Sequence, residues 1–349
     1  MNQSLLFFVI GWCFMFLVWA GSIFCFSFKN SRLKKILGCV FFFNATLYLK
    51  DFFVYQPKFY QSDYFLSLSL SIDAWMIAAW AIFLTELIRP GKTNLWTALS
   101  NSLPLVFISI LFAVTGSQKV FDYSKIYYLF YGIVLYGYFL YHSRLYNKIL
   151  RDNYSYYEGI NIGWVYVILS LFTIYFIVWF FVNKRVDQMI DISYFLFSLA
   201  IWIIVVHKGY YQEAIILENK EEDLPDDFLE ELQQVSKYPL TFEKKINQLI
   251  HEQQVFLDPK LTLPQLAAKI NTNRTYLSNY LNSTLNMSFS SYINSFRLDY
   301  ACKLLADPDN KDTLDVIAEK AGFNSPSTFR RVFIEKFNYP PKLYKRNNS

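Results

Sequence analysis

The stretch TLDVIAEKAGFNSPSTFRRVF, residues 313–333, decides the fold of the C-terminal part of the chain. Thr313 is suited to cap a helix whose apolar side chains share one face, and Gly322 offers the left-handed position that ends such a helix. Ser325 and Pro326 then begin a second helix, because proline is favoured in the first helical turn. Helix, tight turn and helix is the layout that places the second helix in the major groove of DNA.

A second unit with the same layout lies about fifty residues earlier in the chain. Thr262 can cap its first helix, and Pro264 is tolerated in the first turn. A turn at Asn271 follows, after which Thr272 can cap the second helix. The residues expected to face inward from that second helix are Leu277, Tyr280 and Leu281.

One long helix, Ser288–Ala306, is predicted between the two units. Its nineteen residues span roughly 28 Å, because each residue of an α-helix adds about 1.5 Å. Successive major grooves on one face of DNA lie about 34 Å apart. Two recognition helices on this spacer can therefore enter adjacent grooves if the DNA bends slightly.

Small polar and basic side chains face outward from the second helix of each unit. Arginine bonds guanine edges bidentately or holds phosphates, so such a face has a direct use on DNA. The candidate DNA-contacting residues are Asn273, Arg274, Thr275, Ser278, Asn279, Ser325, Ser327, Thr328, Arg330 and Arg331. Most protein–DNA hydrogen bonds go to phosphate and sugar, so none of them is assigned a base. For Arg297, in the long helix, an internal ion-pairing role and a DNA contact both stay open.

The order of these motifs resembles an AraC-type (AraC/XylS family) DNA-binding domain over about 110 residues, close to a third of the chain. The first half of that domain is matched by Leu266-Ala267, Tyr276-Leu277-Ser278, Met287-Ser288-Phe289, Tyr292-Ile293-Asn294, Arg297-Leu298, Ala301 and Leu304-Leu305. The second half is matched by Ile317-Ala318-Glu319, Ala321-Gly322-Phe323, Phe329-Arg330-Arg331-Val332-Phe333, Pro341 and Tyr344.

Three residues depart from the family pattern. Asn286 and Asn338 stand where the family usually has glycine, and Lys345 stands where it usually has arginine. Asparagine accepts left-handed geometry better than most residues, so both turns should survive. Lys345 loses the bidentate bonding of arginine, which affects only that phosphate or packing contact.

The resemblance implies promoter binding that changes transcription, with two copies on repeated sites, and it leaves the sign of regulation open. A helical bundle used for protein contacts has the same periodicity, but the ordered motifs disfavour it. The sequence contains no phosphate-cradling glycine motif and no paired-histidine metal motif. We therefore expect no enzymatic activity, no metal and no cofactor.

The N-terminal part of the chain is too apolar for a soluble domain. The whole chain is 54% hydrophobic and 17% charged, whereas soluble domains are roughly 25% charged. A helix that crosses a membrane needs about 20 mostly apolar residues. The stretches that qualify are Ser4–Phe28, Ile36–Tyr55, Tyr64–Ile88, Leu95–Thr115, Ile126–His142, Ile160–Val182 and Ile190–His207. The second and fifth are the weakest, because the second contains Lys50 and Asp51 and the fifth is rich in tyrosine.

Basic residues favour one side of these seven predicted spans. Nine of them follow the first, third and fifth stretches, and five lie in the other breaks. Because short basic loops stay in the cytoplasm, we expect the N-terminus outside and, after an odd number of spans, the C-terminal domain inside. The first stretch is expected to be retained, because Met1-Asn2-Gln3 carries no positive charge and the run is longer than a signal peptide's apolar region. The expected location is the inner (cytoplasmic) membrane.

Net charge divides the chain into three parts: +7 up to Tyr211, −7 from Gln212 to Tyr238, and +5 beyond. A single soluble globule would not separate charge in this way. A short linker helix is predicted at Asp227–Ser236 within the acidic part. The predicted domains are a transmembrane region at 1–210, an acidic connector at 211–239 and a DNA-binding domain at 240–349.

Ionisable residues within apolar spans cost about 2.5 to 3.5 kcal/mol on insertion scales, so they are candidates for a function. Lys50 in the second stretch and Asp73 in the third are expected to meet in the outer half of the bundle. With Asn44 and Asn101 they are interpreted as a polar ligand pocket or a switch between helices. The alternative is a structural ion pair or side chains that reach toward the interface.

The sequence therefore predicts an all-α protein, with a seven-helix transmembrane bundle followed by a cytoplasmic domain of two helix-turn-helix units joined by a long helix. The predicted function is a membrane-bound one-component transcription regulator. Its expected partners are double-stranded DNA, the lipid bilayer, a second copy of the chain and an unidentified signal ligand or membrane partner. Two alternatives stay open: a transporter with a regulatory DNA-binding domain, and a docking protein for another membrane protein.

Overall fold

The structure, a computed structural model, describes residues 2–182, 188–215 and 240–348. These residues form helices, and the one β-bridge among them pairs Tyr154 with Thr262. The chain divides into two compact units. The first unit comprises Met1–Ser143 and Gly159–Leu217, and the second comprises Arg144–Glu158 and Glu218–Ser349. The predicted all-α class is confirmed.

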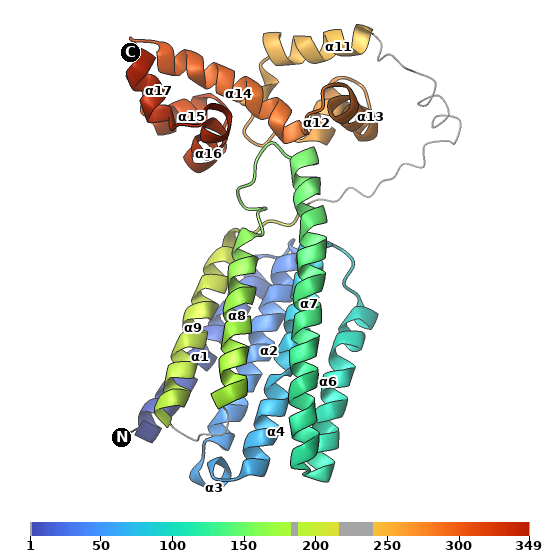
Figure 1. Ribbon diagram of the computed structural model, residues 1–349, viewed down its shortest axis with the longest axis vertical. Helices are drawn as coiled ribbons and strands as arrows, with labels where there is room; N and C mark the ends of the chain where they lie inside the picture. The colour runs from blue at the N-terminus through green and yellow to red at the C-terminus, as the bar shows by residue number, and fades with distance from the viewer. Residues whose placement is uncertain (1, 183–187, 216–239, 349) are drawn as a thin grey trace, which may run out of the picture. The chain divides into compact units, whose positions relative to one another are not determined.

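The first unit is a bundle of long helices that lie side by side (Figure 1). In chain order the helices are α1 (Asn2–Ser22), α2 (Arg32–Val54), α3 (Pro57–Tyr60), α4 (Asp63–Asp73), α5 (Trp75–Ile88), α6 (Leu95–Thr115), α7 (Gln118–Asn153), α8 (Gly163–Val182) and α9 (Gln188–Tyr211). A π-helical turn, Ile23–Ser27, extends α1. Helix α7 begins in the first unit and ends in the second, because the division falls after Ser143.

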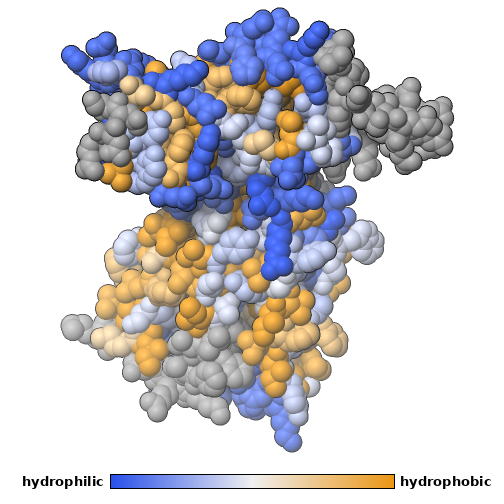
Figure 2. Space-filling model, turned by 45° about the horizontal axis from the view of Figure 1, so that its top comes forward, coloured by the Kyte–Doolittle hydropathy of each residue, from blue (hydrophilic) through white to orange (hydrophobic). Residues whose placement is uncertain are grey.

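Within the described residues, five helical segments are long and apolar enough to cross a membrane. They are Gln3–Ser27, Arg32–Val54, Asp63–Ile88, Leu95–Thr115 and Gln188–Tyr211. Helix α8 contributes a shorter apolar helix, Gly163–Ile174. Figure 2 shows hydrophobic residues gathered on the surface of this unit. A bundle with several apolar helices is therefore observed, and the number of seven spans stays a prediction.

Aromatic side chains fill the interior of the bundle. The ring centroid of Phe41 lies 5.3 Å from that of Phe24 and 5.7 Å from that of Trp202. Trp202 in turn stacks on Trp80 at 5.8 Å. In helices that cross a membrane, close packing of this kind, rather than the hydrophobic effect, holds the helices together, because lipid is as apolar as the side chains.

The second unit contains the C-terminal helices. They are α11 (Leu240–Asn247), the π-helical turn η2 (Gln248–Glu252), the 3₁₀ turn η3 (Val255–Leu257), α12 (Leu263–Lys269), α13 (Arg274–Asn279), the π-helical turn η4 (Tyr280–Thr284), α14 (Phe289–Ala306), α15 (Leu314–Lys320), α16 (Pro326–Phe337) and α17 (Pro341–Asn348). The long helix predicted between the two helix-turn-helix units is confirmed as α14, with Ser288 as its N-cap.

Helix α14 runs from the α12–α13 pair to the α15–α16 pair (Figure 1) and joins two hydrophobic cores. Phe289 and Ile293 belong to the core beneath α12 and α13, and Ala301 and Leu305 belong to the core beneath α15 and α16. Each helix-turn-helix unit therefore packs on its own half of one rigid helix, which sets the spacing between the two recognition helices.

The second unit also contains Arg144–Glu158, the end of α7 and the residues that follow it. The predicted transmembrane region, 1–210, included this segment. The proposed domain boundaries stay predictions. The predicted linker helix Asp227–Ser236 lies outside the described residues.

Candidate nucleic-acid interface

The first helix-turn-helix unit consists of α12, a turn and α13. The backbone N–H of Thr262 donates to Gln265 Oε1 at 2.8 Å, so the predicted cap of α12 is present. Asn271 has a φ of 55°, the left-handed conformation of the predicted turn. The cap of α13 is Asn273 rather than Thr272, because the Asn273 side chain accepts a 2.7 Å hydrogen bond from the N–H of Tyr276. The prediction of Thr272 was therefore wrong by one residue.

The second helix-turn-helix unit consists of α15, a turn and α16. Thr313 and Ser325 cap the two helices as predicted, and Pro326 occupies the first position of α16. Gly322 has a φ of 80°. A Cβ at Gly322 would lie 2.6 Å from the Cα of Leu257, so glycine is also required for the close approach of this turn to η3.

Asparagine replaces glycine at two further left-handed positions. Asn286 has a φ of 52° and Asn338 has a φ of 62°. Both turns survive, as the sequence predicted, because asparagine tolerates this region better than most residues. Lys345 donates to the carbonyl oxygen of Asp312 at 2.9 Å, so this residue ties the loop before α15 to α17.

Most of the candidate DNA-contacting residues lie on the surface of the two recognition helices, α13 and α16. The exposed ones are Arg274, Thr275, Asn279, Ser327, Arg330 and Arg331, and Ser278 is half-buried. Arg330 pairs with Asp315 at 2.6 Å, and both side chains remain more than half exposed. This exposed face is basic and polar, which suits phosphates and base edges.

The remaining candidates also have structural roles. Asn273 and Ser325 accept hydrogen bonds from backbone N–H groups as the caps of α13 and α16. Thr328 is buried, and its hydroxyl donates to the carboxylate of Glu158. Whether any of the ten candidates contacts DNA stays a prediction.

Comparison with known proteins agrees with this geometry. Residues 266–347 match the model of a helix-turn-helix domain family. The predicted resemblance of the C-terminal domain to AraC-type helix-turn-helix domains is confirmed by this match, and the domain is called the AraC-type domain below. No solved structure matches the chain.

Two transcription regulators of Bacillus subtilis (strain 168) are similar to part of the chain. YobQ, an uncharacterized HTH-type transcriptional regulator, is 31% identical over 86 residues, which make up 25% of this chain and 35% of YobQ. YtdP, another uncharacterized HTH-type transcriptional regulator, is 30% identical over 98 residues, which make up 28% of this chain and 12% of YtdP. The chain therefore covers only a minor part of the length of each relative.

Arg297 is fully buried inside the AraC-type domain. Its Nε donates to the carbonyl oxygen of Phe256 at 2.7 Å, and its Nη2 donates to that of Asp258 at 2.6 Å. Two further hydrogen bonds of 3.0 Å reach the carbonyl and hydroxyl oxygens of Ser155. Burial lowers the pKa of Arg297 to about 10, so the side chain is still charged at neutral pH. Arg297 is therefore an internal residue, and its main partners are carbonyl oxygens rather than carboxylates.

The AraC-type domain also contacts Glu158, a residue that was not among the sequence-based candidates. The Glu158 carboxylate accepts hydrogen bonds from the hydroxyls of Ser325 and Thr328 and, at 3.3 Å, from the Asn324 side-chain amide. Burial by itself raises the pKa of Glu158, but these hydrogen bonds outweigh burial and lower it overall. Glu158 stands between two predicted spans without any periodic pattern around it, so no sequence signal marks it.

In the first unit, the predicted meeting of Lys50 and Asp73 is confirmed. Lys50 Nζ lies 3.1 Å from Asp73 Oδ1 and 2.6 Å from Asp51 Oδ1, and it also donates to the hydroxyl of Ser69. One ammonium group therefore stands between two carboxylates. Because these groups lie within apolar helices, their charges are weakly screened.

The hydrogen bonds of Asn44 and Asn101 lead away from this cluster. Asn44 donates to the carbonyl oxygen of Val40 within α2, at 2.8 Å. Asn101 donates to the carbonyl oxygen of Thr97 at 2.6 Å, and its side-chain oxygen accepts from the hydroxyl of Tyr131 at 2.5 Å. None of these hydrogen bonds involves Lys50 or Asp73.

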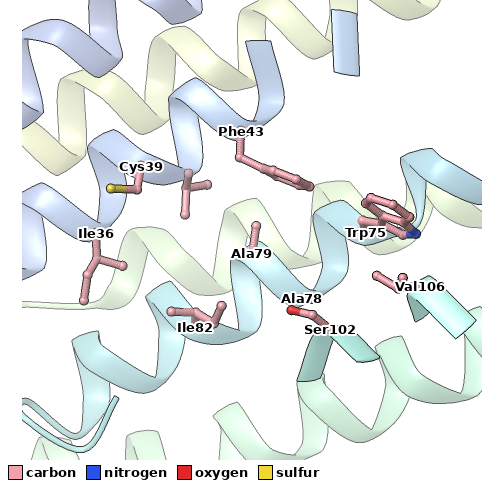
Figure 3. A pocket seen from close by; sticks show the side chains of 10 residues that line it. Ile36, Cys39, Phe43, Trp75, Ala78, Ala79, Ile82, Ser102 and Val106 are labelled. Carbon is pink, nitrogen blue, oxygen red and sulfur yellow. The ribbon is translucent and has the colours of Figure 1, made fainter. Parts of the chain in front are cut away.

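Two pockets of the bundle are relevant to a ligand. An apolar pocket of about 290 Å³ lies between α2, α5 and α6. Figure 3 shows Cys39, Phe43 and Trp75 among its lining residues. A second cavity, of about 220 Å³, is lined by residues of α4, α5, α7, α8 and α9, including Asp73 and Trp80. The buried indole nitrogen of Trp80 has no hydrogen-bond partner among the described residues. This Asp73 cavity therefore combines mostly apolar walls with an acidic residue, and one of its lining residues, Trp80, carries a donor without a partner among the described residues.

Proposed function

We propose that this chain is a membrane-bound one-component transcription regulator, which binds promoter DNA through its two helix-turn-helix units and receives a signal through its transmembrane bundle. One observation carries the proposal: an AraC-type domain and several helices apolar enough to cross a membrane occur in the same chain. The similarity to HTH-type transcriptional regulators supports the DNA-binding part. The apolar helices support a location in the cytoplasmic membrane, and the helix-turn-helix domain supports a cytoplasmic position for the C-terminal part.

DNA binding is tested with the full chain in detergent or lipid nanodiscs. Genome-wide mapping of the DNA bound by the intact protein in cells would first identify target promoters. The purified chain should then bind those duplexes with an affinity that falls steeply with salt, because each phosphate contact releases counterions. Equal, salt-independent affinity for all sequences, or no binding at all, would contradict the proposal. Footprints on two repeated half-sites would support binding by two copies.

We propose that the signal is a ligand that binds in the Asp73 cavity. Lys50, Asp51 and Asp73 together carry a net charge of −1 when all are ionised, and apolar side chains line most of the cavity. These features favour an apolar molecule that carries a cationic or hydrogen-bond-donating group, with an acceptor for the indole N–H of Trp80. A ligand of this kind would act by binding one state of the bundle more tightly than the other.

The signal site is tested by measuring transcription from a mapped target promoter in cells. Lys50→Met and Asp73→Asn should each change the ratio of induced to uninduced expression. Asp63→Asn, at the exposed start of α4, is the matched control and should leave the ratio unchanged. If Lys50→Met and Asp73→Asn both behave like this control while the protein level stays constant, the proposed signal site is wrong. The comparisons with known proteins lend no support to the transporter or docking alternatives.

A further inference from the structure

We infer that residues 153–158 bind the N-terminal ends of both recognition helices and block them, so that this segment and DNA compete for the same side chains. The segment belongs to the same compact unit as the AraC-type domain, so these contacts lie within one unit. The inference rests on the proposed function, because it concerns how DNA binding is controlled.

The strongest contacts are at the start of α16. The carboxylate of Glu158 accepts hydrogen bonds from Ser325, the N-cap, and from Thr328 in the first turn. The guanidinium carbon of Arg331 lies 5.1 Å from the centroid of the Tyr157 ring, within range of a cation–π interaction. The second helix-turn-helix unit carries five of the candidate DNA-contacting residues, and the segment contacts three of them: Ser325, Thr328 and Arg331.

The other end of the segment reaches the first recognition helix. Arg274 is the first residue of α13, and its Nε donates to Asn153 Oδ1 at 2.6 Å. In helix-turn-helix proteins it is the N-terminal part of the recognition helix that contacts base edges. The segment thus contacts both recognition helices where DNA would approach them.

Residues in the middle of the segment hold it on the domain. The hydroxyl of Ser155 donates to the carbonyl oxygen of Leu261 at 2.7 Å, and both Ser155 oxygens accept hydrogen bonds from the buried Arg297. The hydroxyl of Tyr157 donates to Ser290 Oγ at 3.0 Å. The partners in these hydrogen bonds, Leu261, Ser290 and Arg297, lie outside α13 and α16, so these bonds position the segment without using DNA-facing side chains.

The chemistry of Glu158 matches that of a DNA phosphate. A helix N-terminus with its capping hydroxyl is a favourable place for an anion, and a carboxylate and a phosphate both satisfy it. A phosphate that approached α16 would meet the negative charge of Glu158 at close range and would be repelled. The segment must therefore leave before α16 can hold a phosphate at this end.

Protonation does not release the segment at physiological pH. The pKa of Glu158 is lowered, so the carboxylate stays ionised at neutral pH, and its contribution to docking is lost only in acid, as pH falls through the lowered pKa. A mechanical route is available instead, because Asn153 is the last residue of α7 and α7 also lines the Asp73 cavity. A ligand that moved α7 would move this segment.

The first test measures DNA affinity of the full chain at fixed salt, with a duplex that carries a mapped promoter site. Glu158→Ala should raise the affinity about tenfold or more, and Glu158→Gln should raise it less, because an amide still accepts the hydroxyl hydrogen bonds. Glu252→Ala is the matched control, since it removes an exposed carboxylate from the same unit. An increase for Glu158→Ala no larger than that of Glu252→Ala overturns the inference.

The second test uses hydrogen exchange of the unmodified chain, so it does not depend on how the variants fold. The backbone N–H of Ser155 donates to the carbonyl oxygen of Leu261 at 3.3 Å and should exchange slowly without DNA. Saturation with the promoter duplex should speed exchange across residues 153–158. Unchanged or stronger protection in the complex overturns the inference while leaving the proposed function intact. If neither the unmodified chain nor any variant binds DNA, the proposed function fails as well.

Discussion

At the scale of single residues, Gly322 is required for two separate reasons. Its φ of 80° is left-handed, and a Cβ would lie 2.6 Å from the Cα of Leu257 and 2.7 Å from the carbonyl oxygen of Phe256. Gly322→Ala should therefore destabilise the AraC-type domain by at least about 2 kcal/mol, measured by thermal unfolding of the full chain. Asn338→Ala, which changes a left-handed residue without adding a Cβ, should cost about 1 kcal/mol. Equal losses would show that the predicted clash is absent.

Substitutions of the buried Arg297 and the exposed Arg330 should differ in their effect on the free energy of unfolding. Arg297→Met leaves the carbonyl oxygens that it bonds without a donor, so the free energy of unfolding of the AraC-type domain should fall by about 3 kcal/mol. Arg330→Met, on the exposed face of α16, should change stability by less than about 0.5 kcal/mol. Denaturant unfolding of both variants checks this, and a stable Arg297→Met protein would contradict the structural role.

At the scale of elements, the two recognition helices should make different contributions to DNA binding. Arg330→Ala should weaken binding to all sequences and reduce the salt slope of the affinity by about 1, because it removes a phosphate contact. Asn279→Ala should change sequence preference and leave the slope unchanged. Lys336→Ala is the charge-matched control on α16, since its ammonium group pairs with Asp299 at 2.8 Å. Salt titrations with specific and scrambled duplexes measure both effects.

Helix ends were predicted well wherever one residue type has a distinctive conformational preference. The caps Thr313 and Ser325 and the left-handed Gly322 were all found as expected. The cap of α13 is Asn273 rather than the predicted Thr272, and because asparagine is the better N-cap of the two residue types, the sequence already favoured the observed position.

At the scale of the whole molecule, the expected orientation can be measured in cells. Green fluorescent protein fused after Ser349 should fluoresce, and alkaline phosphatase at the same position should be inactive, because the C-terminal domain is expected in the cytoplasm. Alkaline phosphatase fused after Gln61 should be active and after Lys92 inactive, since these residues lie in breaks on opposite sides of the third predicted span. The reverse pattern would place the AraC-type domain outside and remove its access to DNA.

The sequence by itself determined the all-α class and the buried faces of the helix-turn-helix units, since apolar periodicity and cap residues are local signals that survive without knowledge of the fold. The sequence also predicted the contact between Lys50 and Asp73. Two consecutive membrane spans run antiparallel, so residues near the same end of both can meet. Only the tertiary structure decided that Ser155 binds Arg297 and that Glu158 binds Ser325, since these contacts join residues more than a hundred positions apart. Such pairs carry no periodicity and form only when the folded backbone brings their polar groups within hydrogen-bonding distance.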